Sequence, residues 1–368
     1  MSLISNAPAT DAQAATSADQ LNQAALGLAG FSPANFGVVM ATGIVSLAAH
    51  AQTFDRLAQW LFLMNQVMYG ILWALTLLRL LRFPRSFASD LISHTRSHGF
   101  FTTVAASALL SVQCLVFQVH PAAALVLWAL ALLLWLVLTY VVFTALTVKQ
   151  HKPALNEGLS GAWLLAVVAT QSVAISSALM ADGPLHAYRL PLNILALSMW
   201  LWGGMLYIWM MSLIFLRYAF FSLSPGDLTP PYWINMGAMA ISTLGGAVLV
   251  THALGAPQLT SLLPFIKGFT FFYWAAGTWW IPMLLVLSIW RHVIRRFPFS
   301  YDVLYWGAVF PLGMYSASVY WLNKAFDLGF LQPVSTVFFY VAMLAWLIVF
   351  FGLLRHLSRV VSQLRKPV

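Results

Sequence analysis

The chain has 368 residues, of which 61% are hydrophobic and only 7% are charged. A soluble globular domain carries roughly 25% charged residues, so the composition excludes that class. The 18 Lys and Arg and 9 Asp and Glu give a net charge of +9, and none of them occurs between Arg96 and Lys149 or between Asp227 and Lys267. Uncharged apolar stretches of this length indicate membrane spans. The single cysteine, Cys114, excludes an internal disulfide framework and a thiolate metal cluster.

Apolar runs of about 20 residues, the length that crosses a hydrocarbon core of about 30 Å, predict ten transmembrane helices. They cover residues 33–50, 57–81, 100–119, 122–148, 160–181, 190–221, 235–254, 269–294, 306–325 and 333–361. Residues 1–30 contain no Lys or Arg, which a signal peptide needs, and are interpreted as a disordered cytoplasmic tail. Residues 31–361 then form one transmembrane domain, followed by a short cytoplasmic tail at 362–368.

The distribution of Lys and Arg predicts the orientation of these spans. Most of them fall on the side of the N-terminus, and only Arg56, Arg189, Lys267 and Lys324 fall on the opposite side. The positive-inside rule therefore places both termini in the cytoplasm.

Odd-numbered and even-numbered spans differ in composition. The odd spans are richer in Ser, Thr and Gly, and the even spans are longer and hold most of the Trp. Small residues permit close helix packing or line a wet cavity, whereas Trp and Leu suit contact with lipid. The pattern predicts five hairpins, each with a short inner and a long outer helix. Helix breakers at mid-depth, such as Gly43, Pro311 and Gly313, are expected around a permeation path.

The spans lack the chemistry of a charge-relay pump. No Asp, Glu, Lys or Arg lies deep in a predicted span, and His50 and His252 lie near the outer ends. A membrane-bound metal enzyme is an unfavoured alternative, because His94 and His98 are the only pair with metal-like spacing. No phosphate-binding loop is present, which argues against ATP hydrolysis. We expect no catalytic residues, no metal and no cofactor.

Four segments resemble the tellurite-resistance/dicarboxylate transporter family, which includes a yeast malate permease and the plant slow guard-cell anion channel. They are FSPANFGVVMATGI at 31–44, SHGFF at 97–101, PYWINMGA at 231–238 and WGAVFPL at 306–312. Gly99 stands where many members have proline. The resemblance covers residues 31 to about 361.

The resemblance implies an all-α fold in which five hairpins form a quasi-fivefold ring around a central pore, often in a homotrimer. It also implies that an aromatic side chain on the ninth span, here Phe310 beside Pro311, plugs the pore. An anion in an uncharged pore is held by backbone N–H dipoles, by hydroxyls and by the long-range positive field. The hydroxyl candidates are Thr42, Ser46, Thr170, Ser172 and Ser242, and the further pore-lining candidates are Phe36, Gly43, Phe101 and Gly313.

The leading functional hypothesis is a multipass transporter or channel in the inner (plasma) membrane that moves small anions, most of all C4-dicarboxylates such as malate. A monovalent-anion channel or a sulfite or tellurite exporter of the same fold is the alternative. The expected partners are small inorganic or dicarboxylate anions, the lipid bilayer and two further copies of the chain, with no nucleic acid.

Overall fold

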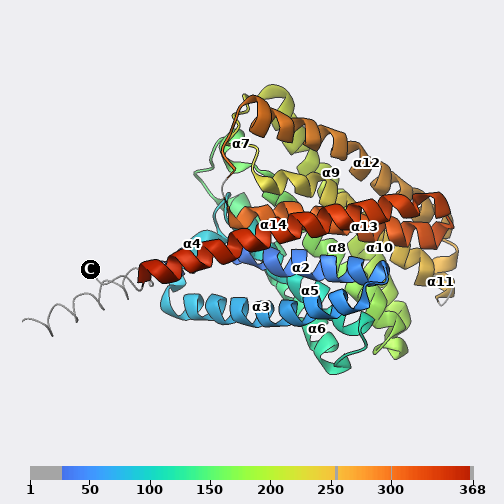
Figure 1. Cartoon of the computed structure of the whole chain (residues 1–368). Helices are drawn as coiled ribbons and strands as arrows, with labels where there is room; N and C mark the ends of the chain where they lie inside the picture. Colours follow the sequence, from blue (N-terminus) through green and yellow to red (C-terminus); the bar gives the residue numbers. More distant parts are fainter. Residues whose placement is uncertain (1–26, 253–255, 300, 365–368) are drawn as a thin grey trace, which may run out of the picture.

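A computed structural model describes residues 27–252, 256–299 and 301–364, and those residues form helices and connecting loops without a β-strand. Long helices run back and forth along one direction (Figure 1). They are α2 (Gly37–Ala51), α3 (Asp55–Arg82), α5 (Phe101–Val116), α6 (Pro121–Val148), α8 (Leu165–Asp182), α9 (Arg189–Phe220), α10 (Ile234–His252), α12 (Leu263–Ile289), α13 (Trp306–Phe326) and α14 (Gln332–Leu364). These helices correspond in order to the ten predicted spans. The predicted tails, 1–30 and 362–368, lie mostly outside the described residues.

Five of these helices form a closed inner ring. Helix α2 contacts α5, and the contacts continue through α8, α10 and α13 back to α2. Each inner helix also packs against the outer helix that follows it, giving the hairpins α2–α3, α5–α6, α8–α9, α10–α12 and α13–α14. The predicted all-α membrane fold of five hairpins is confirmed.

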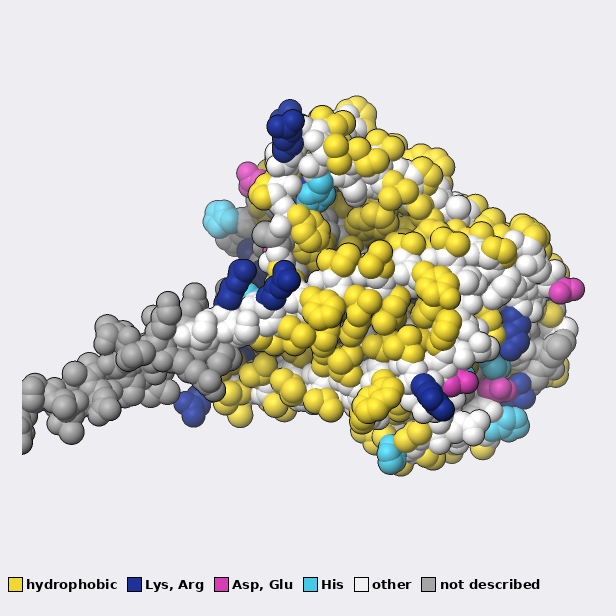
Figure 2. Space-filling model, viewed as in Figure 1, with side chains coloured by type: hydrophobic (Ala, Val, Ile, Leu, Met, Phe, Trp, Pro, Cys, Tyr) yellow, Lys and Arg dark blue, Asp and Glu magenta, His cyan; other side chains and the backbone are white. Residues whose placement is uncertain are grey.

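Burial explains the contrast between odd and even spans. In the inner segment Gly161–Asp182, 94% of the most apolar 18-residue window is buried, compared with 22% for the outer segment Gly329–Val360. Within the described part of the chain, nine helices are long and apolar enough to cross a membrane. The tenth, α13, falls outside that group but packs against α10, α14 and α2, which shield it from lipid. The flank of the bundle is covered by hydrophobic side chains, and charged side chains gather at its two ends (Figure 2).

Every inner helix begins with a short 3₁₀ turn, and the five turns form a second ring. They are η1 (Pro33–Phe36), η2 (Ser97–Phe100), η3 (Gly161–Leu164), η5 (Pro230–Trp233) and η8 (Val303–Tyr305), each touching the next. Glycine permits the closest approach, since a Cβ on Gly161 would lie 2.6 Å from the Pro231 carbonyl oxygen. All inner helices therefore begin at one end of the bundle, the N-end face, and finish at the other, the C-end face.

Shorter elements were not predicted from the apolar runs. They are the surface helices α4 (Pro84–Leu91), α7 (Leu155–Gly158) and α11 (Pro257–Thr260), and a π-helical turn at Trp290–Ile294. The short connection between α5 and α6 contains two residues with positive φ, Gln118 and His120, each with φ of 54°. Proline at the first position of α6 suits a helix start, because its missing N–H has no partner there anyway.

Candidate anion pore

A first cavity lies at the N-end face, between the beginnings of the five inner helices. It has a volume of about 250 Å³, and each helix of the ring contributes to its wall. One lining residue from each is Gly37, Thr102, Leu165, Ile234 and Gly307. This N-end vestibule therefore lies on the quasi-fivefold axis.

A second cavity lies on the same axis at the C-end face. It has a volume of about 510 Å³ and is lined by the last turns of the same five helices. One residue from each is Ala51, Val116, Leu179, Thr251 and Lys324, and His50 and His252 also line it. This C-end vestibule and the N-end vestibule have no lining residue in common.

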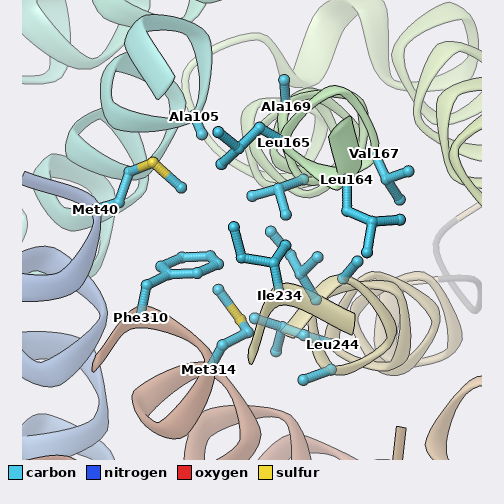
Figure 3. Packing of buried hydrophobic residues seen from close by; sticks show 14 of the residues in the cluster. Met40, Ala105, Leu164, Leu165, Val167, Ala169, Ile234, Leu244, Phe310 and Met314 are labelled. Atoms are coloured by element: carbon cyan, nitrogen blue, oxygen red, sulfur yellow. The ribbon is translucent and has the colours of Figure 1, made fainter. Parts of the chain in front are cut away.

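Apolar side chains separate the two vestibules. Phe310 of α13 lines the inner end of the N-end vestibule with Met40, Leu165 and Ile234, and only 3% of its surface is exposed. Met314, one turn further along α13, is buried in the same cluster. Figure 3 shows Phe310 and Met314 pointing toward side chains from the other inner helices. An aromatic ring and aliphatic side chains thus lie between the two vestibules.

The helix breakers near this constriction lie at helix contacts. Pro311 packs against α10, where a Cβ on Gly237 would lie 2.7 Å from the proline Cγ. A Cβ on Gly313 would lie 3.0 Å from Cγ2 of Ile44 on α2, and one on Gly43 would lie 2.8 Å from an amide nitrogen on α3. These positions allow inner helices to approach their neighbours closely. Pore roles for Pro311, Gly43 and Gly313 stay predictions.

Three of the predicted hydroxyls bind outer helices. The indole of Trp346 on α14 donates to Thr42 at 3.0 Å, and that of Trp135 on α6 donates to Thr170 at 2.8 Å. Ser46 donates to the Ala58 carbonyl of α3 at 2.7 Å. These hydroxyls therefore lie where inner and outer helices meet.

The remaining candidates are also engaged elsewhere. Ser172 and Ser242 donate to carbonyls one turn back in their own helices, each at 2.8 Å. The ring of Phe36 packs edge-on against Trp73 of α3, and the ring of Phe101 lies 6.2 Å from that of Phe143 on α6. Of the predicted pore residues, Phe310 lines the N-end vestibule, and the pore roles of all of them stay predictions.

Two buried amide contacts between helices were not predicted from the sequence. Asn65 of α3 donates to the side-chain oxygen of Gln113 on α5 at 2.7 Å, and Gln171 of α8 donates to the Trp200 carbonyl of α9 at 3.0 Å. Uncharged polar residues within the spans were the available signal, because amides in a bilayer require partners. Both contacts join an inner helix to an outer one.

In each hairpin the outer helix ends beside the segment that leads into the inner helix, and we call this place the N-end corner. In four hairpins a basic side chain at the end of the outer helix closes the corner by donating to a carbonyl of that segment. Arg79 donates to the Ala29 carbonyl at 3.0 Å and Lys149 to the Ile92 carbonyl at 3.2 Å. In the third and fourth hairpins Arg217 donates to the Leu159 carbonyl and Arg291 to the Leu228 carbonyl. Cations at these helix C-termini also offset the negative end of the helix dipole.

Further basic groups surround the N-end vestibule. Arg96 lines its wall, donates to the Gly30 carbonyl at 2.9 Å and pairs with Asp90 at 3.2 Å. Arg79 binds the same carboxylate at 2.5 Å, so two cations share one anion. The N-end face thus keeps an excess of positive charge next to the vestibule.

The histidine pair His94 and His98 lies at the N-end face. The ring of His98 is buried and stacks on Trp163 with centroids 4.1 Å apart. Burial, together with the positive charges of Lys149 and Lys152, lowers the pKa of His94 below its usual value. Among the described residues no three His, Cys, Asp or Glu side chains gather as metal ligands.

A family model described as "voltage-dependent anion channel" (SLAC1) matches residues 30–354. The chain belongs to the SLAC1 voltage-dependent anion channel family. It is therefore a multipass membrane protein of an anion channel and transporter family, not an enzyme, as predicted.

Individual relatives support the same assignment. An uncharacterized membrane protein of Mycobacterium tuberculosis, Rv1735c, is 39% identical over 158 residues, which cover 43% of this chain and 80% of that protein. The uncharacterized transporter MJ0762 of Methanocaldococcus jannaschii is 22% identical, with 90% of this chain and 95% of that protein covered. The sulfite efflux pump SSU1 of Arthroderma benhamiae is 24% identical, with 88% and 90% covered.

Proposed function

We propose that this protein conducts small, singly charged anions along the axis of the inner ring, through a constriction that Phe310 gates. The observation that carries the proposal is the apolar wall between the two vestibules, where Phe310 and Met314 are buried. Among the described residues that line the N-end vestibule, Arg96 is the one charged side chain. Transfer of an ion out of water is costly, and the cost rises with the square of its charge. An anion with one charge therefore crosses such a wall more easily than a dianion.

The electrostatics of the N-end face support anion entry. Five inner helices begin there, and the positive ends of their dipoles point to the vestibule. Arg96 and the four basic residues at the hairpin corners add positive charge around the same mouth. A hydrophobic constriction that opens by wetting then sets the conductance.

The C4-dicarboxylate favoured by the sequence analysis is the second candidate. The combined size of the vestibules and the resemblance to malate permeases favour it, whereas the apolar constriction and the similarity to sulfite efflux pumps favour a small singly charged anion.

The two candidates are separated by flux into proteoliposomes at a fixed membrane potential and pH 7. Chloride, nitrate, hydrogen sulfite and malate are compared for the wild type and for Phe310→Ala. We expect singly charged anions to pass at least about tenfold faster than malate, in keeping with a barrier difference of about 1.4 kcal/mol. Malate uptake without a chloride or nitrate current assigns the dicarboxylate function instead.

The proposal includes a plasma-membrane location with both termini in the cytoplasm and assembly as a homotrimer. The described chain begins and ends at the basic N-end face, since Ala29 is bound by Arg79 and α14 ends there (Figure 1). Trimer assembly is supported by the family resemblance. Labelling of cysteines introduced at each face in intact cells tests the orientation, and the mass of the detergent-solubilised particle tests the trimer.

A further inference from the structure

The N-end corner of the fifth hairpin differs from the other four. Arg355 and Arg359, near the end of its outer helix α14, have no side-chain hydrogen bond, ion pair or ring contact within the described residues. The carboxylate of the segment that leads into α13, Asp302, accepts the backbone N–H of Leu304 at 2.8 Å. Within the described part of the chain, two arginine side chains of α14 therefore have no partner, whereas the basic residues of the other four corners bind a backbone carbonyl.

A groove occupies this open corner. Its volume is about 640 Å³, and it runs between α14 and the segment that leads into α13. Tyr301 forms part of its floor and lies tightly against α14, since a Cβ on Gly352 would be 2.6 Å from the tyrosine Cδ2. The ring of His356 lies 5.7 Å from that of Tyr301. The floor is thus a packed part of the fold.

The groove is apolar at one end and cationic at the other. Further from the end of α14 the groove is lined by Ile348 and Phe351, which are 50% and 58% exposed, and Phe299 of the connecting segment, 64% exposed, also lines it. Toward the end of α14 it is lined by Arg355 and Arg359. In Figure 2, Lys and Arg side chains lie over the end of α14, directly beside the hydrophobic flank. A ligand that fits both parts needs an apolar chain and an anionic head.

We propose that this groove binds an anionic phospholipid from the leaflet at the N-end face, with its phosphate between Arg355 and Arg359 and an acyl chain along Ile348 and Phe351. Basic pockets beside transmembrane helices bind such headgroups, and an exposed apolar wall at the edge of the bilayer meets acyl chains in any case. A free phosphate would leave the apolar half of the groove unused.

The experiment is native mass spectrometry of the purified full chain in detergent, titrated with phosphatidylglycerol or phosphatidylcholine of equal chain length. We expect at least one phosphatidylglycerol to be retained by the wild type and no phosphatidylcholine at the same concentration. Each arginine near an anionic lipid surface contributes about fivefold in affinity, so Arg355→Gln/Arg359→Gln should weaken retention by about 25-fold. Arg355→Lys/Arg359→Lys keeps the charge and should restore most of it.

The matched control is Arg295→Gln/Arg296→Gln, which removes the same charge from exposed residues of the same face that do not line the groove. Equal loss of lipid in both double variants overturns the proposed site, as does equal retention of the two lipids by the wild type. Displacement of phosphatidylglycerol by inorganic phosphate alone would identify a free-anion site and overturn the lipid assignment. Monodisperse elution of every variant confirms that it is folded. Lipid retention is measured directly, so the readout does not depend on transport.

Discussion

The inner helices have two faces of opposite character. The face that points to the axis carries aliphatic and aromatic side chains, among them Met40 and Phe310. The face that packs on the outer helices carries hydroxyls and amides, including Thr170 and Gln113, which bind Trp135 and Asn65. The polar residues of these contacts therefore hold the bundle together, while the constriction between the two vestibules is left apolar. Ion movement and stability are thus expected to respond to different residues.

The largest expected effect is a difference in anion flux between variants of two buried phenylalanines at the N-end of the ring. Phe310→Ala removes the ring that we propose as the gate and should raise anion flux by about tenfold or more, because a hydrophobic constriction restricts passage by excluding water. Phe36→Ala removes a ring that packs on Trp73 of α3 and should lower stability by about 3–5 kcal/mol without raising flux. Flux in liposomes and thermal unfolding in detergent measure the two effects.

A gain in flux from both variants would mean that loosened packing, rather than an opened axis, increases leakage. Unchanged flux in a folded Phe310→Ala protein would falsify the gate.

The second expected effect concerns the buried amide pair. Gln113→Leu leaves the Asn65 amide without its partner in a dry interface and should lower the free energy of unfolding by about 1–3 kcal/mol. Asn65→Leu/Gln113→Leu replaces both groups by apolar ones and should recover most of that loss. Anion selectivity of the folded protein should stay that of the wild type. If it changes in the single variant, the amides take part in the ion path and the two faces are not separate.

The predictable part of the molecule follows from patterns along the chain. Runs of apolar residues gave ten spans close to the observed helices, because a bilayer demands about 20 apolar residues for each crossing. The contrast between Trp-rich and small-residue spans likewise predicted which helices are outside. The direction in which a given hydroxyl points was harder to predict. Thr42 and Ser46 lie four residues apart on α2, yet their partners on α14 and α3 are set by the neighbouring helices.

The partners of the arginines were equally hard to predict from the sequence. Arg217 and Arg291 lie at span ends in the sequence, but their carbonyl partners lie 58 and 63 residues away. Only the hairpin brings such segments together. The open corner beside Arg355 is visible by comparison with these closed ones and has no local sequence signature.

A smaller effect is expected from a single contact between inner and outer helices. Thr170→Val removes the acceptor of the Trp135 indole and should lower stability by about 0.6 kcal/mol, the average for hydrogen bonds between membrane helices. Flux should not change, since this hydroxyl lies away from the axis. Val is nearly the size of Thr, so the unfolding midpoint in detergent reports the lost bond with little change in packing volume. A clear change in conductance would place Thr170 in the path.

The smallest effect is expected at the N-end face, outside the bundle interior, where Asp227 accepts hydrogen bonds from the hydroxyl and backbone N–H of Ser224 at 2.6 and 2.8 Å. These bonds, with the nearby charge of Arg217, lower the pKa of Asp227 below its usual value. Because the folded pKa lies below the unfolded one, the stabilisation is fully present above the unfolded value of about 3.9 and is lost as pH falls through the folded pKa. The carboxylate is partly exposed, so the contribution is small.

The difference in unfolding midpoint between wild type and Asp227→Asn should therefore shrink as pH falls from 7 to 3, while chloride flux differs little between them. A difference that grows toward acid would mean that the protonated carboxyl, not the anion, is the form that the loop stabilises.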